Sequence, residues 1–190
     1  MLDVQILRCI AIAFGLLFLL AGLHKLSQRA HFAGVMADYR VLPESLLPLA
    51  VFTVPLLELS LGIAWLGTAI ILQTVLLVPL ASALLLITYA LAIALNLARG
   101  RRHIDCGCSF SSNHSNSETG YSLSAGLVVR NLLLAALAAT PLLGTNEREL
   151  ILIDHVLLLL ATLVLIFLYA GLNQLLANQG AIDSWRKVDG

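Results

Sequence analysis

The stretch LLPLAVFTVPLLELSLGIAWL, residues Leu46–Leu66, decides the fold of this chain. It contains a single charged side chain, Glu58, and it is as long as the ~20 helical residues that cross a lipid bilayer. Other segments of the chain are similarly long and apolar. The candidate spans are Val4–Leu23, Leu46–Leu66, Ala69–Leu97, Leu127–Leu143 and Leu150–Leu172. The sequence therefore predicts five transmembrane helices.

The composition also indicates a membrane protein. Of the 190 residues, 59% are hydrophobic and 12% are charged, and the mean hydropathy is +0.94, whereas soluble domains are about one-quarter charged. A backbone in lipid must pair its own N–H and C=O groups, and these segments lack the polar alternation of barrel strands. We therefore expect one all-α domain over residues 1–190, a polytopic membrane helical bundle with a polar loop at 98–126 and a polar tail at 173–190.

The first apolar segment has a second interpretation as a signal peptide. Arg8 precedes its apolar run, and Ala21 and Gly22 resemble a cleavage site. Leu19, however, breaks the pattern of small residues that cleavage requires. We therefore favour a membrane helix for this segment.

The charge distribution is more informative than the total charge. The formal net charge is zero, so nothing in it points to nucleic acid as a partner. Five helices place residues 25–45, the loop 98–126 and the tail from residue 173 on one side of the membrane. That side carries Lys25, Arg29, Arg40, Arg99, Arg101, Arg102, Arg186 and Lys187, with Arg130 just inside the membrane. Taken alone, the positive-inside rule predicts that this side is cytoplasmic.

Two cysteines lie one glycine apart in RRHIDCGCSF, residues Arg101–Phe110. In an extended chain the Cα atoms of Cys106 and Cys108 are ~6.6 Å apart, near the upper end of the disulfide range, and a turn shortens that distance. Gly107 adopts the unusual backbone angles of such a small ring at low steric cost. A strained, accessible disulfide is of the labile or catalytic kind. We therefore predict a redox-active pair.

Two other interpretations of the pair remain open. Cys-x-Cys spacing also suits a soft metal ion such as Cu(I), and His103 and His114 lie nearby in the sequence. The thiols are unreactive structural groups in the remaining interpretation. The third cysteine, Cys9, enters the membrane from the opposite side, so we expect a small buried hydrophobe there, with a relay thiol as the alternative.

Glu58 is the strongest buried-charge signal, because an ionisable group so deep in an apolar span requires a partner or a function. It either ties helices together, as an ion pair or a protonated carboxyl, or it transfers protons. Lys25 ends the first segment, where a cation is favoured by the helix C-terminus whatever its function. Tyr89 and Asn96 are expected to form hydrogen bonds between helices.

Three more polar residues lie near the cysteine side. Arg130 and Asn131 open the fourth span, and helix rise places Arg130 about 10 Å from the level of Glu58. A direct pair with Glu58 and a role in stabilising a thiolate are both open for Arg130. Tyr39 is typical of an anchor at the membrane interface rather than of a catalyst, and Asp154 and His155 are expected to be structural.

The motifs GLHKL, YRVLP, PLLELSLG, LNLARGRRHIDCGCSF and VVRN, in this order over residues 15–135, resemble the MauE family of methylamine-utilisation membrane proteins. Its wider relatives are the DoxX-like redox-associated membrane proteins. The resemblance implies a small bundle that works with a thioredoxin-like partner in forming or correcting disulfides of exported proteins. It implies a redox pair at Cys106 and Cys108, surrounded by Lys25, Tyr39, Glu58, Arg130 and Asn131. The chain departs from the pattern at Ser109, which separates Cys108 from Phe110.

The predicted function is therefore membrane thiol–disulfide exchange, an oxidoreductase activity with a thioredoxin-like partner. No cofactor is evident, although analogy with other disulfide-forming bundles makes a quinone a candidate electron acceptor. A soft-metal carrier and a non-catalytic assembly subunit are the alternatives. Disulfide formation requires an oxidising compartment, so we expect a multi-pass protein of the cell membrane whose cysteine face is extracytoplasmic, against the charge count.

Overall fold

The computed structural model describes residues 2–71, 75–101, 123–146 and 151–188. Long helices account for most of them: α1 (Val4–Ser27), α3 (Leu47–Ile71), α4 (Leu77–Ala98), α5 (Ala125–Ala139) and α6 (Leu152–Val188). The 3-10 turns η1 (Glu44–Leu46) and η2 (Thr140–Leu143) extend α3 and α5. All five helices are long and apolar enough to cross a membrane. The predicted all-α bundle with five spans is confirmed.

The element boundaries differ from the prediction in three places. The polar connection after the first span contains an additional helix, α2 (Arg29–Tyr39), whose buried side chains Phe32 and Val35 are too few to form an apolar run. The third span begins at Leu77, and Ala69–Ile71 belong to the end of α3. The predicted tail from residue 173 continues α6 to Val188, because polar composition ends a membrane span but not a helix, and residues 173–188 contain no proline.

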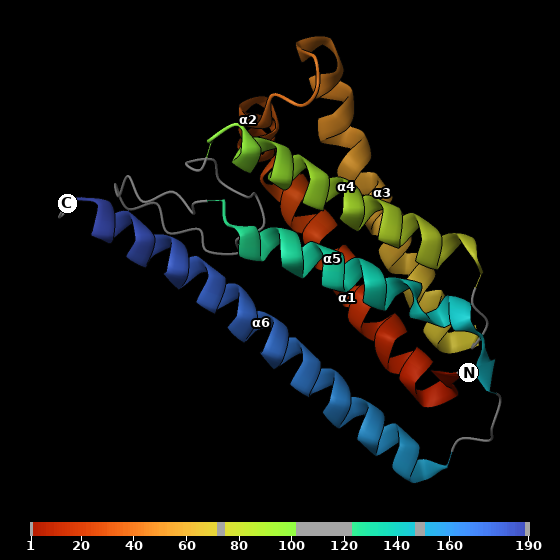
Figure 1. Cartoon of the computed structure of the whole chain (residues 1–190). Helices are drawn as coiled ribbons and strands as arrows, with labels where there is room; N and C mark the ends of the chain where they lie inside the picture. Colours follow the sequence, from red (N-terminus) through yellow and green to blue (C-terminus); the bar gives the residue numbers. More distant parts are fainter. Residues whose placement is uncertain (1, 72–74, 102–122, 147–150, 189–190) are drawn as a thin grey trace.

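Successive long helices run in opposite directions (Figure 1). As a result, α2, the C-terminal ends of α1, α4 and α6, and the N-terminal end of α5 gather at one end of the bundle. We call this the α2 end. The opposite end, which holds the start of α1 and the start of α6, is called the N-terminal end.

α1 and α3 form the closest helix pair because glycines remove side chains from their contact. A Cβ atom added at Gly62 would lie 2.9 Å from the backbone nitrogen of Leu19 and 3.0 Å from the carbonyl oxygen of Gly15. One at Gly22 would lie 2.9 Å from the carbonyl oxygen of Pro55. In a membrane, where lipid is as apolar as the core, such close backbone packing is a main source of helix association.

Aromatic side chains fill the middle of the core. Trp65 of α3 is fully buried, and its ring stacks on Phe14 of α1 with the ring centroids 5.4 Å apart. Its indole Nε1 donates a hydrogen bond to the Ser82 hydroxyl of α4 at 2.8 Å. Trp65 therefore connects three helices and leaves no polar atom of its ring unsatisfied.

The N-terminal end is closed by backbone caps. Asp3 caps α1 by accepting a 2.8 Å hydrogen bond from the Gln5 backbone N–H. Asp154, in the first turn of α6, accepts a 3.0 Å hydrogen bond from the backbone N–H of Ile151, the residue before the helix, in agreement with the structural role predicted for it. The short strands β1 (Leu2–Asp3) and β2 (Thr145–Asn146) pair in parallel between these caps. The polar groups at this end thus satisfy helix termini.

α6 lies along one edge of the bundle (Figure 1). In the most apolar 18-residue stretch of α6, 6% of the residues are buried, compared with 22–39% in the corresponding stretches of the other four spans. Most of its leucines therefore face the surroundings of the bundle, which for a span of this composition is lipid.

Candidate functional site

The site begins with an ion pair inside the bundle. Lys25, in the last turn of α1, donates from Nζ to the Oε1 atom of Glu58 in α3, and the two side chains are 9% and 1% exposed. Of the interpretations open for Glu58, the structure supports a charged partner that ties helices together. That partner is Lys25, which was predicted as a site residue but not as the counter-ion.

Tyr89 of α4 completes this arrangement. Its hydroxyl donates to the same Glu58 oxygen at 2.7 Å, and the Lys25 ammonium lies 5.2 Å from the centroid of its ring. The ammonium also lies 5.7 Å from the ring of Phe32 in α2, so both rings provide cation–π contacts. Lys25, Glu58 and Tyr89, hereafter the buried trio, join α1, α3 and α4, with α2 in contact.

The prediction that Tyr89 bonds between helices is confirmed, although its place in the site was missed. The available signal was a phenol inside an apolar span, because a buried tyrosine hydroxyl requires a partner. Asn96 behaves differently. It is fully buried, and its Nδ2 donates to the Ala92 carbonyl within α4 at 3.0 Å.

Arg130 and Asn131 form a second polar group, at the start of α5. Both are buried, with 7% and 4% of their surface exposed. The Arg130 guanidinium donates to Asn173 Oδ1 of α6 at 2.6 Å, while Asn131 Nδ2 donates back to the Leu127 carbonyl at 3.0 Å. Arg130 thus links α5 to a residue that the sequence analysis placed in the polar tail.

Tyr39 connects α2 to the remaining helix ends. It is the last residue of α2 and packs against a buried cluster formed by Ile93, Leu123 and Leu127. Leu123 is the first described residue after the segment 102–122. Cys106 and Cys108 lie within that segment, outside the described residues, so their predicted pairing stays a prediction.

Comparison with known sequences identifies the family. A family model described as "Methylamine utilisation protein MauE" matches residues 4–144, a range that includes the buried trio, Tyr39, Arg130 and Asn131. The chain belongs to the MauE family. No solved structure matches it.

Individual MauE proteins extend the similarity. The methylamine utilization protein MauE of Paracoccus denitrificans is 34% identical over 175 residues, covering 90% of this chain and 89% of the relative. The MauE protein of Methylophilus methylotrophus is 41% identical over 88 residues, covering 46% and 44% of the two chains. That of Methylorubrum extorquens is 38% identical over 93 residues, covering 49% and 48%.

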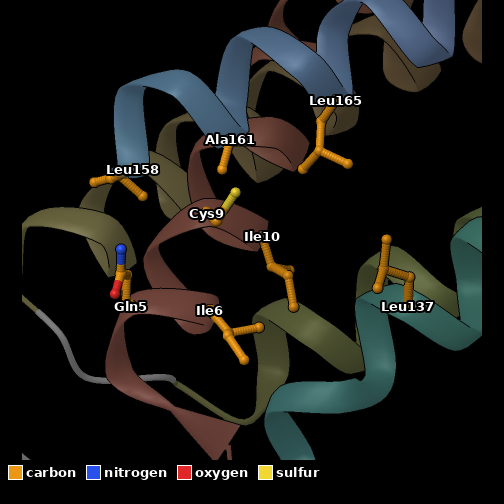
Figure 2. A pocket seen from close by; sticks show the side chains of 8 residues that line it. All are labelled: Gln5, Ile6, Cys9, Ile10, Leu137, Leu158, Ala161 and Leu165. Atoms are coloured by element: carbon orange, nitrogen blue, oxygen red, sulfur yellow. The ribbon is translucent and has the colours of Figure 1, made fainter. Parts of the chain in front are cut away.

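Cys9 of this MauE protein is remote from the buried trio. It is a free, half-buried thiol, about 24 Å from Lys25 by the rise along α1. Figure 2 shows it pointing toward α6 from the wall of a cavity of about 330 Å³ that lies between α1, α5 and α6. The lining is largely apolar and includes Ile6, Leu137 and Leu165. Its Sγ lies 4.0 Å from the Thr162 hydroxyl. These surroundings fit the predicted role of a small hydrophobe.

The arrangement at the α2 end can do two things chemically. It holds a cation and an anion at fixed positions inside lipid, and it fixes the ends of α1, α2 and α4 relative to one another. Among the residues that the structure describes, no three His, Cys, Asp or Glu side chains come together as a metal site.

Proposed function

We propose that this MauE protein is a membrane thiol–disulfide oxidoreductase whose Cys106–Cys108 pair exchanges disulfides with a thioredoxin-like protein. Its clients are exported proteins that require disulfides, and the methylamine utilization relatives make methylamine dehydrogenase a candidate. One observation carries the proposal. Lys25 of the buried trio lies in the last turn of α1, Tyr39 ends α2, and Arg130 lies in the first half of α5. These helix ends are at the α2 end of the bundle (Figure 1), where the chain leads into and out of the cysteine segment.

Chain length keeps the thiols near this end. Five residues lead from Arg101 to Cys106, and a chain spans at most ~3.6 Å per residue, so the two Cα atoms are within about 18 Å of each other. The Arg101 backbone N–H is itself bonded to the Asn96 carbonyl at 3.0 Å, which fixes the start of the tether. Basic residues beside a cysteine favour its reactive thiolate form, whereas the adjacent Asp105 opposes it.

The proposed exchange transfers two electrons from the partner's dithiol to the Cys106–Cys108 disulfide in two steps. A thiolate of the partner attacks one sulfur of the Cys106–Cys108 disulfide, which forms a mixed disulfide and releases the other sulfur as a thiolate. The partner's second thiolate then attacks the mixed disulfide, so the partner becomes oxidised and the pair takes two electrons and, on protonation, two protons. A lipid-soluble quinone is the class of acceptor that would reoxidise the pair within the membrane.

The buried trio is expected to position the ends of the helices rather than to react. Replacing a buried ion pair with apolar residues is often neutral or stabilising, so stability alone does not require Lys25 and Glu58. Their value lies in fixing where α1 ends and α2 begins, next to the helix that leads to the cysteines.

The proposal is tested by trapping the mixed disulfide. In Cys106→Ser and Cys108→Ser proteins, one remaining thiol is expected to stay bonded to a co-purified thioredoxin-like protein, in a band that reduction removes. Cys9→Ser is the matched control and should trap nothing by itself. A double Cys106→Ser, Cys108→Ser protein that still supports full client maturation would exclude the proposed role.

The membrane side is tested separately with a membrane-impermeant thiol reagent on intact cells. We expect labelling of Cys106 and Cys108 only after prior reduction, which corresponds to an extracytoplasmic disulfide. Labelling that requires cell lysis would place the pair on the cytoplasmic side, as the positive-inside rule predicts.

A further inference from the structure

Four arginines at the α2 end have no carboxylate counter-ion among the residues that the structure describes. Arg29, Arg40 and Arg99 are exposed and Arg101 is half-buried. Within the described part of the chain, the only ion pair between a basic side chain and a carboxylate is that of Lys25 with Glu58. The four guanidiniums are therefore unpaired there. The exposed carboxylates on the nearby elements α2 and η1 are Asp38 and Glu44, so positive charge is in excess.

Two of these arginines meet where α2 and α4 end. The Arg99 guanidinium donates to the backbone carbonyl of Arg40 at 3.3 Å. Arg40 is the C-cap residue of α2 and has a left-handed backbone conformation, with φ of 45°. Arg101 lies two residues after Arg99 in the sequence. Like charges brought together in this way, with no carboxylate of the described residues paired to them, form a surface that favours an anionic ligand.

The location of the junction indicates a protein rather than a lipid headgroup as that ligand. Tyr39, adjacent to Arg40, packs on the buried cluster of Ile93, Leu123 and Leu127. The junction therefore lies beside the last described residues before the cysteine segment, where the protein partner of the proposed exchange would approach.

We propose that Arg40, Arg99 and Arg101, flanked by Arg29, are the docking surface for an acidic face of the partner protein. The inference rests on the proposed function and specifies the partner's chemistry. A partner that reacts with Cys106 must come within reach of a chain that extends at most about 18 Å from Arg101, and a partner of protein size at that distance is close enough to contact the junction. Covering unpaired guanidiniums without opposing carboxylates is costly, while complementary charge steers association. The partner must therefore carry Asp or Glu beside its dithiol.

This assignment also accounts for the conflict between the positive-inside rule, which predicts a cytoplasmic α2 end, and disulfide formation, which requires an oxidising compartment. Arginines that are needed for a docking surface are not evidence for the side of the membrane on which they lie. The excess of basic residues at the α2 end is then compatible with an extracytoplasmic cysteine pair.

The test measures disulfide exchange by the full-length protein in nanodiscs of zwitterionic phosphatidylcholine. The substrates are a thioredoxin-like protein with carboxylates beside its dithiol, its variant with those carboxylates changed to amides, and the neutral reductant dithiothreitol. Between about 0.01 M and about 1 M salt the Debye length falls from ~30 Å to ~3 Å. The rate constant with the acidic protein should fall on the order of tenfold or more over this range.

The double variant Arg40→Glu, Arg99→Glu should lose on the order of tenfold in the same rate constant at low salt. Its reaction with dithiothreitol should change less than about twofold, since a small neutral thiol needs no docking surface. The amide variant of the partner should react slowly with both proteins. Unchanged dithiothreitol kinetics also show that the double variant is folded.

Each other outcome overturns the docking surface in a distinguishable way. Equal, salt-independent rates for the acidic protein and its amide variant exclude acidic docking while leaving the exchange function intact. A dependence on Arg40 and Arg99 that appears only when anionic phosphatidylglycerol is added assigns the arginines to lipid. Absence of reaction even with dithiothreitol removes the exchange function, and the docking surface with it.

Discussion

The two ends of the bundle both carry polar side chains, and the bonds described at the two ends differ in kind. At the N-terminal end, Asp3 and Asp154 accept from backbone N–H groups, and Arg8 donates to the Ala69 carbonyl in the last turn of α3 at 3.2 Å. Toward the α2 end, Arg99, Asn96 and Asn131 also bond to backbone carbonyls, but other polar side chains bond to one another between helices, as in the Lys25–Glu58 pair. The backbone groups at every helix end need hydrogen-bond partners. A helix bundle does not need hydrogen bonds between buried side chains in the same way.

Under the proposed function, this contrast separates polar groups that cap helices from polar groups that position the site. Caps at the N-terminal end satisfy groups that any helix would leave open. The buried trio instead introduces charge that an apolar bundle could omit. Changes at the α2 end should therefore affect thiol exchange, whereas changes at the N-terminal end should affect stability alone.

The largest effect is expected for Glu58→Leu, which leaves the Lys25 ammonium buried without its carboxylate. Breaking a buried pair in this way destabilises a protein by about 3–5 kcal/mol. Thermal unfolding in detergent measures it. The double variant Lys25→Met, Glu58→Leu is the control and should recover most of the stability but not the rate of exchange. Full recovery of both would show that the pair is only structural.

A smaller loss is expected for Gly62→Ala, at the contact between α1 and α3. The new Cβ would lie 2.9 Å from a backbone nitrogen of Leu19, so the helices must separate, at a cost of about 1–3 kcal/mol. Gly67→Ala in the same helix is the matched control, because a Cβ there meets nothing within 4 Å. Equal melting temperatures for the two variants would contradict the close packing.

Tyr89→Phe should cost less again, because Lys25 continues to donate to the Glu58 carboxylate. Loss of the 2.7 Å hydrogen bond corresponds to about 1–2 kcal/mol in a membrane bundle. The exchange rate should fall more than that of Ser82→Ala, which removes the 2.8 Å bond from Trp65 elsewhere in the core. If both variants slow exchange equally, Tyr89 has no special positioning role.

The sequence predicts the spans well because apolar length is a local property. It does not predict the buried trio, since Lys25, Glu58 and Tyr89 come from three helices, and which of their faces meet depends on tertiary packing, such as that of α1 on α3 at Gly62. The sequence does not predict α2 because few of its residues are buried. It does not predict the extension of α6 either, because hydropathy indicates which residues suit lipid and not which residues are helical. Side-chain pairing thus required the packed structure, whereas the polar residues themselves were visible beforehand.

The smallest effect tests the N-terminal end. Asp3→Ala removes the cap that accepts from the Gln5 N–H and should lower the stability of the bundle by about 1 kcal/mol. Asp3→Asn is the control, since asparagine caps equally well. Neither variant should alter the exchange rate, because Asp3 lies at the opposite end of α1 from Lys25. A slowed exchange in Asp3→Ala at a temperature where the protein stays folded would mean that the two ends are coupled, and the division between capping and site polarity would then fail.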